Sequence, residues 1–366
     1  ENVAFVLGTD RKFVYEHRQA PVLESSRDVV VQVVATGLCG SDIHYWQHGQ
    51  VGPYKVEKPL VLGHESSGIV VSCGPEVRGL KVGDRVAMEP GVSCNHCDSC
   101  RKGRYNLCSH MRFAATPPHN GTLATYYCLP QECCFLLPHD ISLRDGALVE
   151  PLGIAVHACR QAGDMQGQSV VIFGAGPIGQ LCCSVASAFG ASKVVVTDVV
   201  EERLTFALGK GATAVHRMSP GADSSESVAE LKRLEGLELG ASIVMDATGV
   251  EGCINCGIAL LKRGGTFVQV GLGARQLSLP VGDICDKEAT FKGSFRYGPG
   301  DFQLAVSLLT DKRVNLNGMV THCFPFESAQ QAFENVVGRQ GIKSVILGPS
   351  VDNEMATKTK ELFNKH

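Results

Sequence analysis

The sequence lacks any apolar run long enough to cross a membrane. Its longest such stretches, VVVQVV and SVVIFGAG, fall far short of the ~20 residues that a spanning helix needs. The N-terminal residues ENVAFVLGTDRKF also lack the long apolar core of a signal peptide. The formal net charge is only −3, with no basic stripe and no charged tail, which argues against nucleic-acid binding. We therefore expect a globular protein with a cytoplasmic location.

Internal repeats and low-complexity tracts are also missing, so the chain is neither a solenoid nor a linker. Its 366 residues exceed what one compact domain usually holds, which predicts two domains. Cysteine, by contrast, is plentiful at 16 residues. In a reducing compartment such cysteines are expected to remain thiols or to bind metal rather than to form disulfides.

Two kinds of pattern divide the chain. Residues 1 to about 150 are rich in short β-type runs such as VVVQVVATG and GIVVSCGP, which predict a small β-barrel or sandwich. From Ser169 to about Gly273, strand-like SVVIFG and KVVVTD alternate with helix-like PIGQLCCSVASAFG and EERLTFALGKG. This alternation predicts a parallel sheet with crossover helices, so the fold class is α/β. From about Asp286 the pattern loosens and ends in strand-like KSVILGP.

Four cysteines, Cys94, Cys97, Cys100 and Cys108, lie in one short segment with the spacing C-x2-C-x2-C-x7-C. Two-residue gaps let neighbouring thiolates converge on one ion, and four thiolates at tetrahedral corners suit a structural Zn2+. An iron–sulfur cluster usually has a different spacing, and four buried free thiols are the plain alternative. A closed four-thiolate site has no open position, so we expect the reaction to take place elsewhere.

A glycine-rich motif, Gly174-Ala175-Gly176-Pro177-Ile178-Gly179, fits G-x-G-x-x-G after a strand and at the start of a helix. Gly174 would allow the tight turn, Gly176 the approach of a pyrophosphate, and Gly179 close packing of helix on strand. The next strand ends at Asp198, where an acid should bind the adenosine ribose and favour NAD over NADP. Arg203 weakens that preference slightly, because a nearby arginine can accommodate a 2′-phosphate. A plain tight turn is the alternative.

A second set of candidate ligands comes from GLCGSDIHYW (residues 37–46) and LGHESSG (62–68). Cys39 offers a thiolate, His64 an imidazole and Glu65 a carboxylate. Three protein ligands and an open position are typical of a catalytic zinc. From these residues alone, a buried core thiol and a hydrogen-bonded histidine remain equally good interpretations.

Taken together, these motifs resemble those of the zinc-containing medium-chain alcohol dehydrogenases over essentially the whole chain. Within that family the chain is most similar to the polyol branch, the xylitol and sorbitol dehydrogenases. The stretches that carry this closer resemblance are HYWQHG (44–49), RYNLC (104–108), FAATPPHNGTL (113–123), ALVEPLGIAVHA (147–158) and GSFRYG (293–298). Glu150 stands where many alcohol dehydrogenases have a third zinc-binding cysteine, as it does in polyol dehydrogenases. FRYGPGDFQLAV and the intact four-cysteine segment look more like the fungal xylitol enzymes than the animal sorbitol enzymes.

The resemblance implies a GroES-like β-barrel catalytic domain at residues 1–151, completed by 288–366, and a Rossmann NAD-binding domain at 152–287. It also implies a homotetramer, one catalytic and one structural Zn2+ per chain, and reversible NAD-linked oxidation of a secondary alcohol of a polyol to the ketose. Xylitol to D-xylulose and sorbitol to fructose are the expected pairs. A carboxylate in place of a thiolate should make the metal site harder and wetter, which suits vicinal hydroxyls.

Roles for individual residues follow from the same resemblance. Cys39, His64 and Glu65 would be metal ligands, and Glu150 either a ligand or a group bonded to the zinc-bound water. Ser41 and His44 would relay protons, or else be a turn serine and a surface histidine. The residues that would line the polyol pocket are Tyr45, Phe113, Thr116, Glu150, Arg296 and Tyr297. Those that would contact NAD, besides the motif glycines, Pro177, Asp198 and Arg203, are Ile178, Val270, Gly271, Leu272, Ser294, Phe295 and Arg296.

Other residues with chemical potential have plainer interpretations. Cys253 and Cys256 are expected to be buried thiols, and His157, on the apolar run IAVHA, a core histidine rather than a ligand. Rival functions are another zinc alcohol dehydrogenase, acting on L-arabinitol, threonine or a simple alcohol, and a non-catalytic, nucleotide-binding protein of the crystallin type. The sequence does not give the preferred polyol or the favoured direction.

Overall fold

The structure, a computed structural model, describes residues 2–219, 224–234 and 236–349. Contacts divide the described residues into two units, one drawn from residues 2–150 and 316–349 and the other from the described part of residues 151–315. We expected the return to the first unit at residue 288. The division lies later because strand β18 (Thr290–Gly293) pairs with β17 (Leu261–Gln269) in the parallel sheet of the second unit.

The first unit is mainly β-structure with short helices. Its strands are β1 (Asn2–Leu7), β2 (Phe13–Arg18), β3 (Asp28–Gly37), β4 (Gln50–Val51), β5 (Tyr54–Lys55), β6 (Leu60–Val61), β7 (Glu65–Cys73), β8 (Arg85–Met88), β9 (Gly91–Val92), β10 (Arg112–Phe113), β11 (Tyr126–Pro130), β12 (Cys134–Leu136), β19 (Val320–Phe324) and β20 (Lys343–Leu347). Its helices are α1 (Gly40–His48), α2 (Asp98–Arg101), α3 (Leu143–Gly146) and α11 (Ala329–Val337), with 3-10 turns at Tyr105–Leu107, Gln131–Cys133 and Phe326–Ser328.

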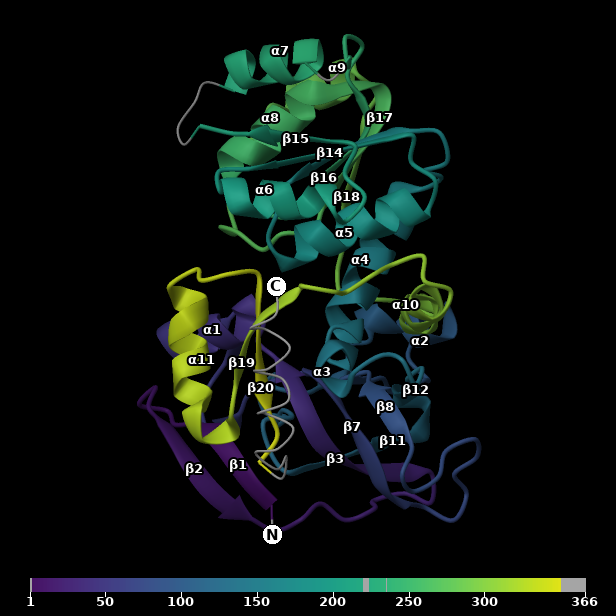
Figure 1. The fold of residues 1–366 in the computed structure, drawn as a ribbon, viewed down its shortest axis with the longest axis vertical. Helices are drawn as coiled ribbons and strands as arrows, with labels where there is room; N and C mark the ends of the chain where they lie inside the picture. The colour runs from purple at the N-terminus through teal and green to yellow at the C-terminus, as the bar shows by residue number, and fades with distance from the viewer. Residues whose placement is uncertain (1, 220–223, 235, 350–366) are drawn as a thin grey trace. The chain divides into compact units, whose positions relative to one another are not determined.

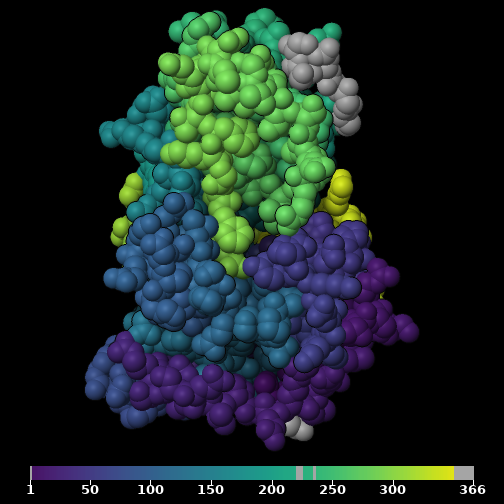
Figure 2. All heavy atoms as spheres, turned by 180° about the vertical axis from the view of Figure 1, so that it is seen from behind, coloured from purple at the N-terminus to yellow at the C-terminus, as the bar shows by residue number. Residues whose placement is uncertain are grey.

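Strand β3 is the centre of the first unit. Its sequence DVVVQVVATG is almost entirely buried, and β-branched residues favour such a pleated surface. Strands β7 and β11 pair with it antiparallel, and so does β20 from the far end of the chain, which Figure 1 draws in yellow beside β3. The C-terminal segment therefore completes this unit, as the resemblance implied. Figure 2 shows the blue residues near position 100 forming part of its surface.

The second unit alternates strands with helices. Its strands are β13 (Ser169–Phe173), β14 (Lys193–Asp198), β15 (Ala214–Arg217), β16 (Ala241–Asp246), β17 and β18. Its helices are α5 (Pro177–Ala188), α6 (Glu201–Leu208), α7 (Ser224–Leu234), α8 (Glu251–Leu260), α9 (Val281–Asp286) and α10 (Asp301–Thr310), together with most of α4 (Val149–Ala162).

All strand pairs in this sheet are parallel, and the strand order is β15-β14-β13-β16-β17-β18. The order reverses direction between β13 and β16, and in open α/β sheets ligands bind outside the carboxyl ends of the strands at that point. The glycine-rich motif follows β13 directly, so the topology confirms the α/β, Rossmann-like prediction. None of the helices in the described part of the chain is long and apolar enough to cross a membrane.

Candidate functional site

The four-cysteine lobe, defined here as residues 94–108, brings its thiols into one cluster. The sulfur atoms of Cys94, Cys97, Cys100 and Cys108 all lie within 4.8 Å of one another. Backbone amides stabilise them: Cys97 N–H donates to Cys94 Sγ (3.3 Å) and Cys94 N–H to Cys108 Sγ (3.4 Å). A hydrogen bond from the Cys100 backbone lowers the pKa of Cys97 to about 6. The set offers four convergent sulfur ligands, which fits a structural zinc.

No disulfide links the cysteines, all of which lie in the described residues and are free. Burial raises the pKa of the Cys256 thiol to about 12, and of Cys253 less strongly. A neutral buried thiol is a poor nucleophile and metal ligand, so neither residue behaves as a redox group.

A second ligand group forms at the carboxyl end of β3. One ligand atom each from Cys39, His64 and Glu65 lies within 4.8 Å of the others. Cys39 precedes helix α1, while His64 and Glu65 stand at the start of β7, where Glu65 pairs in register with Gly37 of β3. His64 and Glu65 are buried, with exposed fractions of 6% and 1%. A thiolate, an imidazole and a carboxylate fit a catalytic zinc that keeps an open position.

Asp42 orders this ligand group, although the sequence analysis assigned it no role. It is fully buried, and its carboxylate accepts the backbone N–H groups of Cys39 (3.1 Å) and Gly63 (3.0 Å). Its Oδ1 atom lies 3.7 Å from His64 Nδ1. Burial raises the pKa of Asp42, but His64 outweighs that effect and lowers it. A carboxylate beside the second ring nitrogen orients a metal-binding histidine. The available signal was its position three residues after Cys39, as in a capping box.

Lys343 is a second residue that sequence reasoning missed. This lysine is 3% exposed, pairs with the carboxylate of Glu65 and donates to the Leu38 carbonyl at 2.8 Å. Burial lowers the pKa of Lys343, but the negative charges of Glu65, Cys39 and Glu150 outweigh it and raise the pKa. Gly37 leaves room for the pair, because a Cβ there would meet Glu65 Oε2 at 2.3 Å. The only sequence signal for this role was a single charged residue at the start of the apolar stretch KSVIL.

The other residues predicted in the first unit lie at several positions around this group. Phe113 is buried, with its ring 5.7 Å from that of His64. Tyr45 is buried on α1, whereas His44 is exposed and its ring lies 5.6 Å from that of His48. Ser41 is partly buried on the first turn of α1. Phe113 therefore lies beside one of the candidate metal ligands.

Two further predicted residues of the first unit are Glu150 and Thr116. Glu150 is 2% exposed and close enough to raise the pKa of Lys343, but it does not belong to the group whose ligand atoms converge. Thr116 is partly buried in a turn, where its carbonyl accepts the N–H of His119 at 2.8 Å.

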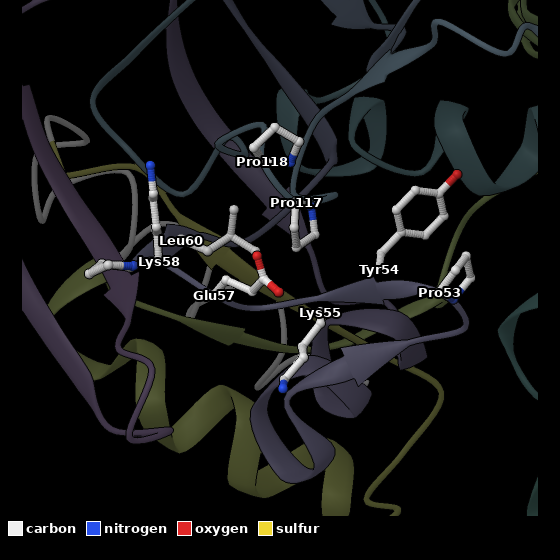
Figure 3. Close-up of a pocket in the computed structure, with 9 residues that line it drawn as sticks. Pro53, Tyr54, Lys55, Glu57, Lys58, Leu60, Pro117 and Pro118 are labelled. Atoms are coloured by element: carbon white, nitrogen blue, oxygen red, sulfur yellow. The ribbon is translucent and has the colours of Figure 1, made fainter.

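An open hollow of about 460 Å3 lies next to Thr116 in sequence (Figure 3). Its lining residues are Pro53, Tyr54, Lys55, Glu57, Lys58, Pro59, Leu60, Pro117 and Pro118. In Figure 3 the side chains of Lys55 and Lys58 extend in different directions, so the hollow does not gather positive charge at one point. No residue of the metal-ligand group lines it.

The glycine-rich motif of the second unit has the geometry that a dinucleotide requires. Gly174 has φ +95°, a conformation that favours glycine. At Gly179 a Cβ would lie 1.8 Å from the Gly174 carbonyl oxygen, so helix α5 lies against the turn. At Gly176 a Cβ would meet nothing within 4 Å, which leaves open space at the N-terminus of α5. That space and the free helix N–H groups fit the pyrophosphate of NAD.

The acid predicted to bind the ribose contacts the motif itself. Asp198 Oδ2 accepts the N–H of Ala175 at 2.6 Å, and its Oδ1 accepts the N–H of Val200 at 2.9 Å. Asp198 is partly buried at the end of β14, so it lies where the ribose is expected and also holds the glycine turn. Arg203 lies on α6, and Gln180 donates to its carbonyl at 2.7 Å. Pro177 and Ile178 are partly exposed in the first turn of α5.

A second loop at the same sheet edge is ordered by Asp246, another residue missed from sequence. Its carboxylate accepts the Thr248 hydroxyl (2.6 Å) and the Gly249 N–H (2.7 Å). Its carbonyl accepts the N–H groups of Val270 (2.9 Å) and Gly271 (2.8 Å). A carboxylate at the end of a parallel strand was the available signal. The structure thus brings predicted NAD contacts at 270–271 to the edge that carries the glycine motif.

The remaining predicted contacts follow β18. Ser294 donates its backbone N–H to Gln269, while its buried side-chain hydroxyl has no hydrogen-bond partner among the described residues. An orphaned buried hydroxyl here is consistent with a bound cofactor group. Leu272 and Phe295 are 73% and 48% exposed. Arg296 has φ +56°, and its guanidinium lies 4.8 Å from the Phe295 ring centre, whereas Tyr297 is only 2% exposed.

The chain matches two family models, one described as alcohol dehydrogenase GroES-like domain over residues 25–139 and one as zinc-binding dehydrogenase over residues 177–311. It is 50% identical over 349 residues to the probable D-xylulose reductase A of Aspergillus clavatus and 49% identical over 348 residues to that of Neosartorya fischeri. Each match covers 95% of this chain and 97% of the relative.

A solved structure of similar fold is an oxidoreductase/dehydrogenase of unknown specificity from Escherichia coli, with a TM-score of 0.88 and 33% identity. That match covers 94% of this chain and 99% of the other. The family models together with the relatives' identity and coverage show that the chain belongs to the polyol branch of the zinc-containing medium-chain alcohol dehydrogenases, with a GroES-like and a Rossmann-like domain.

Proposed function

We propose that the chain is a zinc-dependent, NAD-linked polyol dehydrogenase that interconverts xylitol and D-xylulose. Two relatives named probable D-xylulose reductase share about half of its residues over almost the whole chain, which supports this substrate pair. The observation that carries the proposal is the convergence of Cys39, His64 and Glu65. A donor set of sulfur, nitrogen and oxygen is typical of a catalytic zinc rather than a structural one.

When bound, zinc supplies Lewis acidity that makes a nearby hydroxyl easier to deprotonate, and NAD accepts the hydride. The rest of the chemistry belongs to the chain's own residues. Asp42, whose Oδ1 atom lies 3.7 Å from His64 Nδ1, would help to orient the His64 ring electrostatically. Lys343 pairs with the Glu65 carboxylate and compensates its negative charge in this buried site.

Each remaining predicted residue keeps its role as a proposal. Phe113 packs beside His64 and excludes water from that face of the imidazole. Ser41 and the exposed His44, both on α1, pass the hydroxyl proton towards solvent. Glu150, whose charge helps to raise the pKa of Lys343, would be either a further metal ligand or a group bonded to water at the metal. Arg296, which can donate several hydrogen bonds, binds substrate hydroxyls.

NAD binding rests on the second unit. Helix α5 presents its N-terminal N–H groups across the open space at Gly176, and Asp198 stands at the end of the next strand. A carboxylate at that position repels a 2′-phosphate, which supports NAD over NADP. The homotetramer and the cytoplasmic location are part of the same proposal, supported by the family resemblance.

The test is a comparison of initial rates of reduced-cofactor formation on xylitol, sorbitol and L-arabinitol, each with NAD and with NADP. We expect the highest kcat/KM for xylitol with NAD. A preference for L-arabinitol or sorbitol would change the substrate assignment within the polyol branch. Absence of activity on all three polyols, in protein shown to contain zinc, would overturn the proposal.

A further inference from the structure

The turn that carries Arg296 is fixed at both ends by hydrogen bonds. This turn, Ser294–Gly300, connects β18 to α10. At its start, the Ser294 N–H donates to the carbonyl of Gln269 at 2.9 Å. At its end, the Gly298 N–H donates to the Asp301 carboxylate at 2.7 Å, and the Pro299 carbonyl accepts a hydrogen bond from Arg160 at 3.2 Å. The segment between these two attachments, residues 295–297, carries Arg296.

Asp301 is the centre of the second attachment. It is the first residue of α10 and 1% exposed. Two residues of α4 also bind its carboxylate: His157 Nδ1 donates at 2.7 Å, and the Arg160 guanidinium donates to the other oxygen. Burial raises the pKa of Asp301, but the bonds from His157, Gly298 and Arg160 outweigh it and lower the pKa. His157 is thus buried as predicted, but it is one part of a polar cluster.

Arg296, between the two attachments, has an unusual backbone conformation. Its φ of +56° is in the left-handed region, which non-glycine residues adopt only when the surrounding structure imposes it. The next side chain is fixed as well, because the Tyr297 ring packs edge-on against Phe302 of α10 with centroids 5.5 Å apart. Residues held in this way cluster at functional sites, where a side chain has to be presented in one direction.

We propose that Asp301, together with His157 and Arg160, positions Arg296 by holding the Ser294–Gly300 turn, in which the Arg296 backbone is left-handed. The inference rests on the proposed function, in which Arg296 binds polyol hydroxyls. These are positioning residues: they act through the turn and have no assigned contact with substrate or cofactor. The buried charge of Asp301 is what the cluster requires, since three donor groups, from His157, Arg160 and Gly298, converge on its carboxylate.

The decisive variant is Asp301→Asn, which keeps the shape of the side chain and removes its charge. Because misplacing a binding group by about 1 Å can cost ~100-fold, we expect the KM for xylitol to rise by about 10- to 100-fold. The dissociation constant for NADH should rise by a clearly smaller factor, because the glycine motif and Asp198 lie outside the turn. Amide hydrogen exchange of residues 294–300 should become at least about tenfold faster, with strands β13–β16 unaffected, as expected for a local opening.

The matched control is Glu251→Gln. Glu251 is also the first residue of a helix in the same unit, and its carboxylate also accepts a backbone N–H, that of Ser278 at 3.0 Å. It should leave the KM and the exchange of residues 294–300 unchanged. If Asp301→Asn does not fold, Arg160→Met is the deciding variant, because Arg160 is half exposed and its replacement is less disruptive to the core. Arg160→Lys then provides the comparison that retains the charge.

Unchanged exchange at 294–300 in Asp301→Asn, or in Arg160→Met, would overturn the positioning role, as would equal losses in KM and NADH affinity. Faster exchange with an unchanged xylitol KM would do the same. These outcomes are distinct from failure of the proposed function, which would appear as absence of polyol turnover in the wild-type protein while its hydrogen exchange could still be measured.

Discussion

Identical thiols in this chain have very different surroundings, and the difference predicts different effects of the same substitution. Cys39 lies in the ligand group with His64 and Glu65, whereas Cys285 is exposed on α9. We expect Cys39→Ser to abolish polyol oxidation and to lower zinc from two to one per chain, because a hydroxyl is a poor replacement for a thiolate ligand. Cys285→Ser should change neither. Elemental analysis with steady-state rates provides the measurement, and substantial activity in Cys39→Ser would contradict the ligand assignment.

Lys343 gives a second prediction at this scale, for stability. Lys343→Met removes the cation from a buried pair and leaves the Glu65 carboxylate without it. Breaking a buried pair in this way costs about 3–5 kcal/mol, and we expect a loss of that size in the free energy of unfolding of metal-free protein. Lys12→Met, at an exposed pair, should stay within about 0.5 kcal/mol. Denaturant titration measures both, and equal stabilities for the two variants would show that the buried pair contributes nothing.

Sequence alone pointed to the candidate ligands whose atoms converge in the structure, but not to the residues that support them. Cys39, His64 and Glu65 stand in short motifs whose chemistry can be interpreted locally. Lys343 reaches the group through a strand whose pairing with β3 links distant parts of the chain. Similarly, His157 was correctly predicted to be buried, but its partner Asp301 is 144 residues away. Long-range side-chain partners depend on tertiary packing, which no local pattern encodes.

At the scale of elements, the glycine motif allows two similar substitutions with opposite expected effects. In Gly179→Ala the new methyl group would lie against the Gly174 carbonyl, so α5 has to move and stability should fall by about 1–3 kcal/mol. In Gly176→Ala the methyl group enters open space, so the fold should be unaffected while NADH affinity falls. Thermal unfolding and NADH fluorescence titration separate the effects. A stable Gly179→Ala variant with normal affinity would contradict the role of close helix packing.

The first turn of α10 predicts a dependence of stability on pH. The pKa of Asp301 is lower in the folded protein than the ~3.9 of a free aspartate. Its carboxylate therefore stabilises the fold above about pH 4, and this contribution is lost as the pH falls through the lowered pKa. The difference in unfolding free energy between wild type and Asp301→Asn should be largest near neutral pH and shrink towards pH 2. A difference that is independent of pH would show that the charge of Asp301 is unimportant.

The elements themselves were largely predictable, because alternation of strands and helices follows from periodicity. The first unit's central strand and the order of β13, α5 and β14 agree with the patterns in the sequence. The boundary between the two units at residue 315, rather than the expected 287, could not be predicted from the sequence. Strand β18 is exposed along its length and lacks the apolar run of its neighbours, so TFKG does not stand out as the last strand of a parallel sheet.

At the scale of the molecule, metal and cofactor sites belong to separate units of the chain. Both cysteine-containing ligand groups lie in the first unit, and the glycine motif lies in the second. Removing all zinc with a chelator should therefore abolish turnover while leaving NADH binding intact, and loss of the lobe's metal should lower the unfolding temperature. Fluorescence titration and calorimetry of stripped and reloaded protein test this. Undiminished polyol oxidation without zinc would contradict the catalytic role of the metal.

The pairing of β20 with β3 has a consequence for synthesis on the ribosome. Strand β3 is made early, yet its partner and the lysine that neutralises Glu65 arrive only with residues 343–347. Domains at the start of a chain tend to fold first during translation. The first unit cannot complete its folding in that order, because the part of β3 that pairs with β20 stays unpaired until residues 343–347 have been made. Nascent chains stalled before codon 343 should therefore be the species that chaperones bind, and a premature stop there should leave a protein that can neither complete its central sheet nor neutralise its buried carboxylate.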